Sequence, residues 1–217
     1  MKNITHFLFD FDGTLIDSMD TFCRCVLNVL DKYGAKYPSD IIKTVTPMGV
    51  KDTPRYCVNN FNMSISEEEF RDLMLKIAVP DYVESIPEKK NVTATMRELK
   101  ARGYSLNILT GSPHETLDPC FKRLGFGELF EKAWSVNDFP YNKTDPRIYL
   151  MSAELLGVKP ENIVFLDDNI DANRAAKAAG LTVIGVYDVS SEAFRDTMKS
   201  ELDGYIDTMD ELLDFEF

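Results

Sequence analysis

The feature that most constrains this chain is a pair of aspartates at the end of its first apolar run. Residues 7–9 are apolar, and they are followed by Asp10, Phe11, Asp12 and Gly13. Because strand residues two apart point to the same side, a strand ending here would deliver both carboxylates to one place. Two like charges held that close are costly unless a cation lies near them. The alternative is an ordinary strand end followed by a helix cap, and other segments have to decide between the two.

Composition narrows the class of protein. The chain has 217 residues, 44% of them hydrophobic, which suits one large domain or a main domain with a smaller insert. Its net charge of -12 disfavours nucleic acid and anionic membrane surfaces as partners. No apolar run approaches the roughly 18 residues needed to span a bilayer, and the start lacks signal-peptide features. We therefore expect a cytoplasmic protein, a monomer with a dimer as the alternative.

The four cysteines suggest neither a metal site nor a disulfide framework. Cys23, Cys25, Cys57 and Cys120 form no CxxC pair and have no zinc-like spacing. We expect free and mostly buried thiols.

Short strand-like runs alternate with helical stretches over much of the chain. One such helix spans 91–102 before Gly103, and another, rich in alanine, spans 170–179 before Gly180. Alternation of this kind predicts an α/β fold with a parallel sheet. We also expect Trp134 to pack in the core or in a strand, and residues 205–217 to add a short strand and a helix. The clearest predicted strands are 5–9, 105–109, 163–166 and 182–186.

Between Asp17 and about Glu88 the strand pattern disappears. Ser66 followed by Glu69 resembles a capping box at the start of a helix. An all-helical insert at 17–87, placed after the first strand, is the simplest account, with 1–16 and 88–217 forming the α/β core. Its expected hinges are the turn after Thr14 and the stretch 80–87. An earlier helix in the insert is indicated by one apolar face, made of Phe22, Val26, Val29, Leu30 and Tyr33.

Polar residues directly follow three of the predicted strands. They are Asp10, Thr110 and the pair Asp167 and Asp168. The carboxyl ends of parallel strands share one edge of an open sheet, so these side chains should converge. Clustered carboxylates without nearby His or Cys suit Mg²⁺. The alternative for residues 167–168 is a pair of aspartates that cap a helix.

Two further segments could bind an anion. The turn Thr110, Gly111, Ser112 offers hydroxyls and backbone N–H groups just ahead of a predicted helix. Taken alone, this turn is also typical of an ordinary loop or helix cap. Lys143 precedes a predicted helix at 145–156, and by itself it reads as a solvated surface lysine.

In order and spacing, these segments resemble the haloacid dehalogenase-like superfamily, in its phosphoglycolate phosphatase and β-phosphoglucomutase branch. The matching segments are 9–15, 109–112, Lys143, 165–168 and 175–180, so the resemblance covers essentially the whole chain. It implies a Rossmann-like, doubly wound parallel sheet with a small helical cap inserted after the first strand. It also implies a phosphatase acting on a small phosphorylated metabolite.

The resemblance assigns roles by motif. Asp10 would be the nucleophile that forms an aspartyl phosphate, and Asp12 the general acid and then the general base. Thr110 and the Gly111 N–H would hold phosphoryl oxygens, while Lys143 would neutralise charge. Ser112 is a further candidate near the phosphate.

The resemblance also implies a Mg²⁺ site. Its ligands would be Asp10, the backbone carbonyl of Asp12, and Asp168. Asp167 stands where the family usually has glycine, and it would contact the metal indirectly. The distal acidic position is Ala172, so Asp171 would have to compensate by a shift of one residue. Thr144 replaces the proline that usually follows the motif lysine.

Three other activities remain as alternatives. Dehalogenases of this superfamily lack the second aspartate, so Asp12 favours phosphoryl transfer. Phosphosugar mutases of the β-phosphoglucomutase type carry a histidine where this chain has Phe22, which disfavours but does not exclude a mutase. A non-hydrolytic phosphoacceptor module is the third, and an acid/base at Asp12 works against storing the phosphate.

Substrate choice is expected to lie in the helical insert. The stretch 46–51 is placed where related caps present a specificity loop. Gly49 would permit close approach of the backbone, and Lys51 could meet a second anionic group on the substrate. A solvated lysine next to a turn is the alternative for Lys51.

Overall fold

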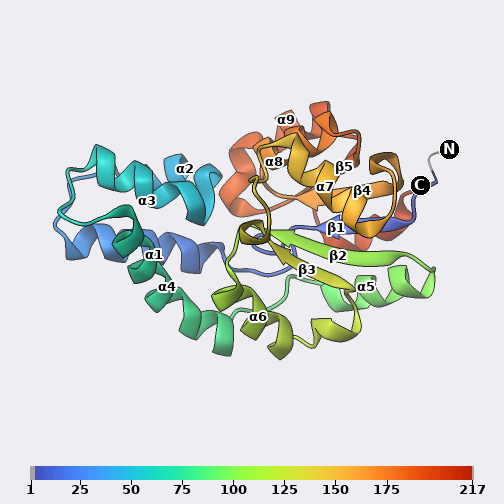
Figure 1. Cartoon of the computed structure of the whole chain (residues 1–217), viewed down its shortest axis with the longest axis horizontal. Helices are drawn as coiled ribbons and strands as arrows, with labels where there is room; N and C mark the ends of the chain where they lie inside the picture. Colours follow the sequence, from blue (N-terminus) through green and yellow to red (C-terminus); the bar gives the residue numbers. More distant parts are fainter. Residues whose placement is uncertain (1–2, 217) are drawn as a thin grey trace.

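A computed structural model describes residues 3–216 and shows a six-stranded, fully parallel sheet in the order β3-β2-β1-β4-β5-β6 (Figure 1). The chain starts in the middle at β1, builds outward to one edge through β2 and β3, and then crosses to the other. This confirms the predicted Rossmann-like, doubly wound sheet. The strands are β1 (His6–Phe9), β2 (Ser105–Thr110), β3 (Lys132–Ser135), β4 (Ile163–Asp167), β5 (Thr182–Val186) and β6 (Gly204–Ile206).

Helices cover both faces of the sheet. On one face lie α5 (Val92–Ala101), α6 (His114–Arg123) and the 3₁₀ turn η6 (Met209–Asp214). On the other lie α7 (Pro146–Leu156) and α8 (Ile170–Ala178), with α9 (Arg195–Glu201) near the β6 edge (Figure 1). The other short 3₁₀ turns of this part are η2 (Phe126–Glu128), η3 (Val136–Asp138), η4 (Pro160–Asn162) and η5 (Val189–Phe194).

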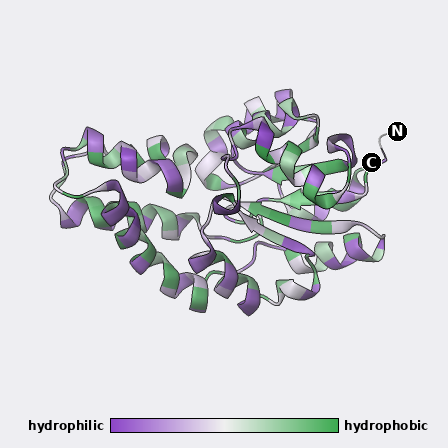
Figure 2. Ribbon diagram, viewed as in Figure 1, coloured by the Kyte–Doolittle hydropathy of each residue, from purple (hydrophilic) through white to green (hydrophobic). Residues whose placement is uncertain are grey.

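The central strand shows why the sheet takes two helical layers. Phe7 and Phe9 pack into the cluster under α5 and α6, while Leu8 packs into the cluster under α7 and α8. All three side chains are fully buried. A strand buried on both faces reads as a continuous apolar run, as residues 7–9 do. The helices carry alternating hydrophilic and hydrophobic bands in Figure 2, as expected for elements with one face on the core and one in water.

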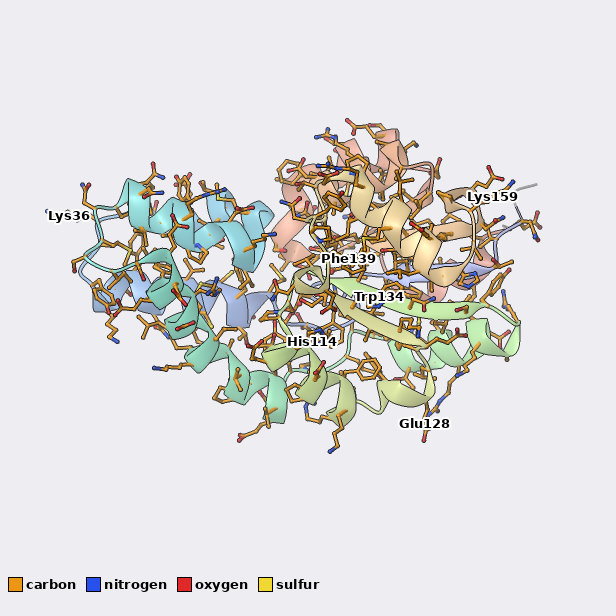
Figure 3. All side chains as sticks on the ribbon, viewed as in Figure 1. Lys36, His114, Glu128, Trp134, Phe139 and Lys159 are labelled. Atoms are coloured by element: carbon orange, nitrogen blue, oxygen red, sulfur yellow. The ribbon has the colours of Figure 1, made fainter. Side chains whose placement is uncertain are left out.

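The insert is helical, as predicted. It contains α1 (Met19–Lys32), α2 (Ile41–Val45), η1 (Thr46–Met48), α3 (Gly49–Asn60) and α4 (Glu67–Glu84). These elements enclose an apolar cluster of their own that includes Leu30, Val45 and Phe70. The Ser66 hydroxyl caps α4 by accepting from the Glu69 N–H at 3.0 Å, as expected. In Figure 3, Lys36 marks the far end of this helical part and Lys159 the opposite end of the molecule.

The two connections between the helical part and the sheet run side by side. The Asp17 N–H donates to the Pro87 carbonyl at 3.0 Å, and the Lys89 N–H donates to the Leu15 carbonyl at 2.9 Å. The second connection is shorter than predicted, because α4 continues through Pro80 to Glu84. Packing against α1, α3 and α6 stabilises the helix despite the hydrogen bond that proline removes. The division into a core and a cap domain remains a prediction.

Two edge strands were not delimited from the sequence. β3 contains Trp134, whose ring meets Phe139 edge-on at 5.8 Å between centroids, so its expected packing role is confirmed (Figure 3). β6 and the 3₁₀ turn η6 form the predicted last strand and helix. Among the described residues, no helix is both long and apolar enough to cross a bilayer.

Candidate active site

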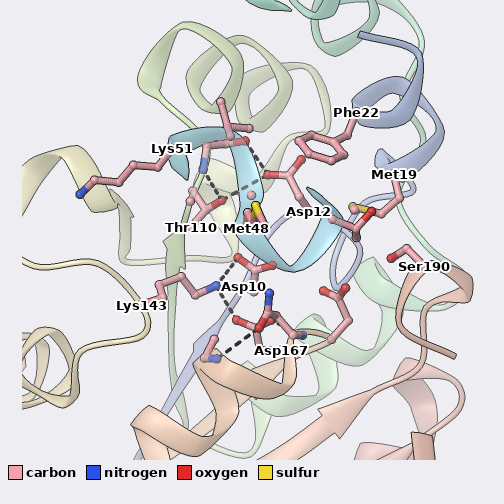
Figure 4. Close-up of a pocket in the computed structure, with 18 of the residues that line it drawn as sticks. Asp10, Asp12, Met19, Phe22, Met48, Lys51, Thr110, Lys143, Asp167 and Ser190 are labelled. Atoms are coloured by element: carbon pink, nitrogen blue, oxygen red, sulfur yellow. Dashed lines mark hydrogen bonds and ion pairs between the residues drawn. The ribbon is translucent and has the colours of Figure 1, made fainter. Parts of the chain in front are cut away.

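A cavity opens where the carboxyl ends of β1, β2 and β4 meet the helical part (Figure 4). This is the point where the strand order reverses, which is where ligands bind in open α/β sheets. The volume is about 170 Å³, below the roughly 300–1,000 Å³ of pockets for drug-sized ligands, so a bound ligand should be small.

Asp10 lies at the floor of this cavity. It follows β1 directly, and its N–H donates to the Leu166 carbonyl of β4 at 2.8 Å, which extends the sheet pairing by one residue. The side chain is buried, and its Oδ1 lies 2.6 Å from the Lys143 Nζ. Burial raises the pKa of Asp10, helped by the charges of Asp167 and Asp12 and opposed by the ammonium of Lys143.

Lys143 joins two carboxylates. Its Nζ lies 2.6 Å from Asp10 Oδ1 and 2.5 Å from Asp167 Oδ2, and only 12% of its side chain is exposed. The buried Tyr149 hydroxyl fixes its backbone by donating to the Lys143 carbonyl at 2.8 Å. Burial alone would lower the pKa of Lys143, but the two carboxylates outweigh burial and raise it. Lys143 is therefore a charged, buried part of the site, and the solvated reading of this lysine is wrong.

Asp168 is held close to the loop after β1. Its Oδ1 accepts from the Thr14 hydroxyl at 3.1 Å, and its N–H donates back to the same hydroxyl at 3.2 Å. Gly13 has φ of +75°, and a Cβ there would lie 2.9 Å from the Asp168 carboxylate, so the loop requires glycine. Burial and then the charge of Asp167 raise the pKa of Asp168.

Three of these carboxylates could hold a divalent cation. Asp10, Asp167 and Asp168 are all buried, and each offers an oxygen within 4.8 Å of the other two. Hard oxygen donors of this kind fit Mg²⁺, and a cation there would offset the cost of burying adjacent negative charges. Asp167 lies within the cluster itself, and its Oδ1 also accepts from the Asn169 N–H at 2.7 Å.

Asp12 has an entirely different environment. Its two carboxylate oxygens accept hydrogen bonds from four hydroxyl groups. Oδ1 accepts from Ser18 at 2.7 Å and from Tyr82. Oδ2 accepts from Ser112 at 2.6 Å and from Thr110 at 3.2 Å.

The turn after β2 provides half of those donors. The Thr110 hydroxyl also accepts from the Ser112 N–H at 3.0 Å, which folds the turn back on itself. Ser135, at the end of β3, donates to the Ser112 carbonyl at 2.7 Å and supports the turn from the neighbouring strand. Gly111 lines the cavity and is exposed to it.

The structure separates the remaining candidates. Gly49 and Lys51 line the cavity from the start of α3, but the Lys51 side chain extends away from Asp10 in Figure 4. Asp171 is not among the described residues that line the cavity. Its carboxylate is exposed and lies 3.7 Å from Arg174 Nη1, so Asp171 does not replace the missing distal acid at Ala172.

Sequence reasoning missed two residues that contact Asp12. Tyr82 continues a stripe that repeats every four residues along α4, after Phe70, Met74 and Ala78. Such a stripe predicts core packing and not a role in a site. Ser18 precedes α1 and reads as a helix cap, but it makes no side-chain cap hydrogen bond. Neither belongs to a motif, because a hydroxyl that serves a carboxylate distant in sequence leaves no local pattern.

Comparison with known proteins agrees with this geometry. A family model described as haloacid dehalogenase-like hydrolase matches residues 7–186. The chain is 28% identical to a pyrophosphatase, PpaX, of Bacillus velezensis, with 85% of this chain and 84% of the relative aligned. It is 28% identical to a phosphoglycolate phosphatase of Psychrobacter arcticus, with 82% and 81% aligned. A β-phosphoglucomutase structure from Clostridium difficile superimposes with a TM-score of 0.79 at 16% identity, covering 96% of this chain and 93% of that one.

Proposed function

Because the chain belongs to the haloacid dehalogenase-like hydrolase family, we propose that it hydrolyses the phosphate monoester of a small metabolite. One observation carries the proposal: two carboxylates two residues apart reach the same cavity in different environments. Asp10 is paired with a buried ammonium, whereas Asp12 is surrounded by neutral hydroxyls. Titratable groups kept in such distinct surroundings are suited to distinct catalytic roles.

In the proposed reaction, Asp10 attacks the phosphorus atom and forms an aspartyl phosphate. The bond to the leaving oxygen breaks, and that oxygen takes a proton from Asp12. Asp12 then accepts a proton from the water that attacks the phosphorus of the intermediate, which releases phosphate and restores Asp10. Both carboxyl groups end the cycle as they began it.

The surrounding residues would stabilise charge on the transferring group. Lys143 is placed to neutralise phosphoryl oxygens next to Asp10, and Asp167 holds the ammonium from its other side. Thr110 and the Gly111 N–H lie at the edge of the same cavity, where they would bind phosphoryl oxygens. Ser112 completes the turn that presents them.

We propose Mg²⁺ as the cofactor, held by Asp10, the Asp12 carbonyl and Asp168, with Asp167 nearby. When bound, the ion would screen the anionic phosphate from the carboxylate nucleophile. The three buried carboxylates of the cluster support this assignment. The cytoplasmic location and the monomeric state remain predictions from the sequence.

We further propose that residues 17–87 act as a cap that selects the substrate. Met48, Gly49 and Lys51 reach the cavity from this part of the chain. The paired connections at Asp17 and Pro87 would let the cap move as a unit against the sheet edge. A contact between Lys51 and a second anionic group would require the side chain to turn toward the cavity.

Of the alternatives, a phosphosugar mutase of the β-phosphoglucomutase type is the nearest rival. Phe22 lines the cavity where such mutases have a histidine, so no imidazole is supplied at that position. A phosphoacceptor module would need a long-lived aspartyl phosphate, and Asp12 at the same cavity works against one.

The proposal is tested by phosphate release from a panel of sugar phosphates, phosphoglycolate and pyrophosphate, with Mg²⁺ and with excess chelator. We expect release that needs Mg²⁺ and is lost in Asp10→Asn. Asp171→Asn is the matched control, since it makes the same change at an exposed carboxylate outside the cavity. Turnover retained by Asp10→Asn, or no release from any compound by the unaltered protein, would contradict the proposal.

A further inference from the structure

The hydrogen bonds to Asp12 leave its carboxylate with no spare acceptor site. An ionised carboxylate offers about four lone-pair positions, and four hydroxyl groups donate to Asp12. To give a proton to a substrate oxygen, Asp12 must therefore exchange at least one of these partners. The hydroxyl that leaves determines which oxygen of Asp12 transfers the proton.

The four donors come from two separate parts of the molecule. Ser18 and Tyr82 donate to Oδ1 from the helical part and its connection, whereas Thr110 and Ser112 donate to Oδ2 from the end of β2 and the turn that follows it. A phosphate that binds Thr110 competes directly for the partner of Oδ2. Oδ2 is thus the oxygen that substrate frees, and Oδ1 keeps its donors.

Both donors to Oδ1 are buried, Ser18 at 1% exposure and Tyr82 at 6%. The backbone of Tyr82 is also tied to the sheet side, because its carbonyl accepts from the Arg123 Nε at 3.2 Å. Arg123 also donates to the Ile86 carbonyl and so holds the end of α4 against α6. A rigid phenol on an anchored backbone fixes the direction of its hydrogen bond more tightly than the short Ser18 hydroxyl does.

We propose that Tyr82 is a positioning residue, whose phenol holds Oδ1 of Asp12 so that Oδ2 faces the leaving oxygen of the phosphate ester. This inference rests on the proposed function. In the first step Asp10 forms its bond to phosphorus, the bond to the leaving oxygen breaks, and Oδ2 transfers its proton to that oxygen. Tyr82 keeps its own proton throughout and touches no reacting atom.

The test compares two esters that differ in their need for an acid. p-Nitrophenolate leaves as a stable anion, whereas the alkoxide of glycerol 3-phosphate has to be protonated. Because kcat/KM reports the steps up to phosphoryl transfer, we expect Tyr82→Phe to lower it at least about tenfold more for the alkyl ester than for p-nitrophenyl phosphate. Asp12→Asn should show the same bias to a larger extent.

Tyr33→Phe provides the matched control. It also removes a phenol that donates to a carboxylate, Glu69 at 3.2 Å, but on the exposed surface of the same helical part. Its kinetics on both esters should match those of the unaltered protein.

Other outcomes for Tyr82→Phe would contradict the positioning role. An equal loss on both esters in Tyr82→Phe would show a general structural defect. No loss would show that Oδ1 needs no phenol. Either result overturns the inference but not the proposed phosphatase activity. Hydrolysis of the aryl ester alone by the unaltered protein would mean that no acid is delivered, which also overturns it. If the unaltered protein hydrolyses neither ester and releases no phosphate from any compound of the panel named above, the proposed function and this inference fall together.

Discussion

Asp10 and Asp12 are two residues apart, yet the regions around them are built from different chemistry. Around Asp10 the partners are charged: a buried ammonium and two further buried carboxylates. Around Asp12 they are four neutral hydroxyls. The ammonium of Lys143 favours the ionised form of Asp10 that must attack, and it opposes the burial and the neighbouring carboxylates that raise the pKa of Asp10. Neutral hydroxyl donors suit a carboxyl group that must gain and lose a proton.

The two regions also differ in how they are assembled. The Asp10 region is built almost entirely from strand ends of the sheet, together with the loop that carries Lys143. The Asp12 region joins the sheet to the helical part through Ser18 and Tyr82. We infer that the first region is fixed by the sheet, while the second responds to the position of the helical part.

The largest difference between the regions should appear in Asp12→Asn. This change removes the proton donor and acceptor but leaves the nucleophile, so phosphate release should fall by about 10²- to 10⁴-fold. Steady-state release and circular dichroism measure the loss and the fold. Loss of activity with retained fold is expected; turnover close to that of the unaltered protein would show that Asp12 moves no proton.

Lys143→Met should have the next largest effect, because it removes the cation between Asp10 and Asp167. We expect kcat to fall by about 10²- to 10³-fold, as when a single charge-stabilising donor is lost. Lys51→Met is the matched comparison, since its lysine extends away from Asp10 and should matter far less for a substrate with one phosphate. Equal losses in the two variants would contradict the role given to Lys143.

Ser112→Ala should cause a smaller loss, because three hydroxyls still donate to Asp12. A hydrogen bond to a charged group contributes about 1.5–3 kcal/mol, so a loss of about 10- to 100-fold in kcat is expected. Stopped-flow or steady-state release resolves a change of this size. A loss as large as that of Asp12→Asn would mean that the other three hydroxyls cannot hold Asp12 in place without Ser112.

The smallest effect concerns His114, at the start of the helix that follows Ser112. Its ring lies 2.8 Å from Asp118 and 3.0 Å from Asp138, and these carboxylates raise its pKa above 6.5. Because the folded-state pKa is raised, the stabilisation is fully present below the unfolded value and is lost as the pH rises through the folded one. The groups are partly exposed, so the gain should stay below about 1 kcal/mol.

Urea unfolding of His114→Gln checks this prediction. The variant should be less stable than the unaltered protein at about pH 5.5, and the two should converge at about pH 8.5. A difference that grows with pH would contradict the sign.

Much of the sheet could be predicted from the sequence. The strands β1, β2, β4 and β5 are buried on both faces, so each is mostly apolar, although β2 contains the buried Asn107. β3 and β6 are edge strands of four and three residues, which is too short for a strand pattern to stand out, and such strands depend on pairing more than on their own residues.

Some residues of the site could also be predicted from the sequence, and others could not. Thr110, Asp167 and Asp168 could be brought together in advance because strand ends share one edge. The burial of Lys143 could not be read from its own segment, since it depends on carboxylates far away in the chain. Tyr82 was missed for the same reason, because its partner lies 70 residues earlier and its helix looked like simple core packing.

In the proposed reaction Asp10, and not Asp12, forms the bond to phosphorus. The most direct measurement quenches the protein during turnover with borohydride, which reduces an acyl phosphate to an alcohol, and locates the altered residue by peptide mass mapping. We expect homoserine at Asp10 in the unaltered protein and none at Asp12. Modification at Asp12, or at neither position while phosphate is being released, would contradict it.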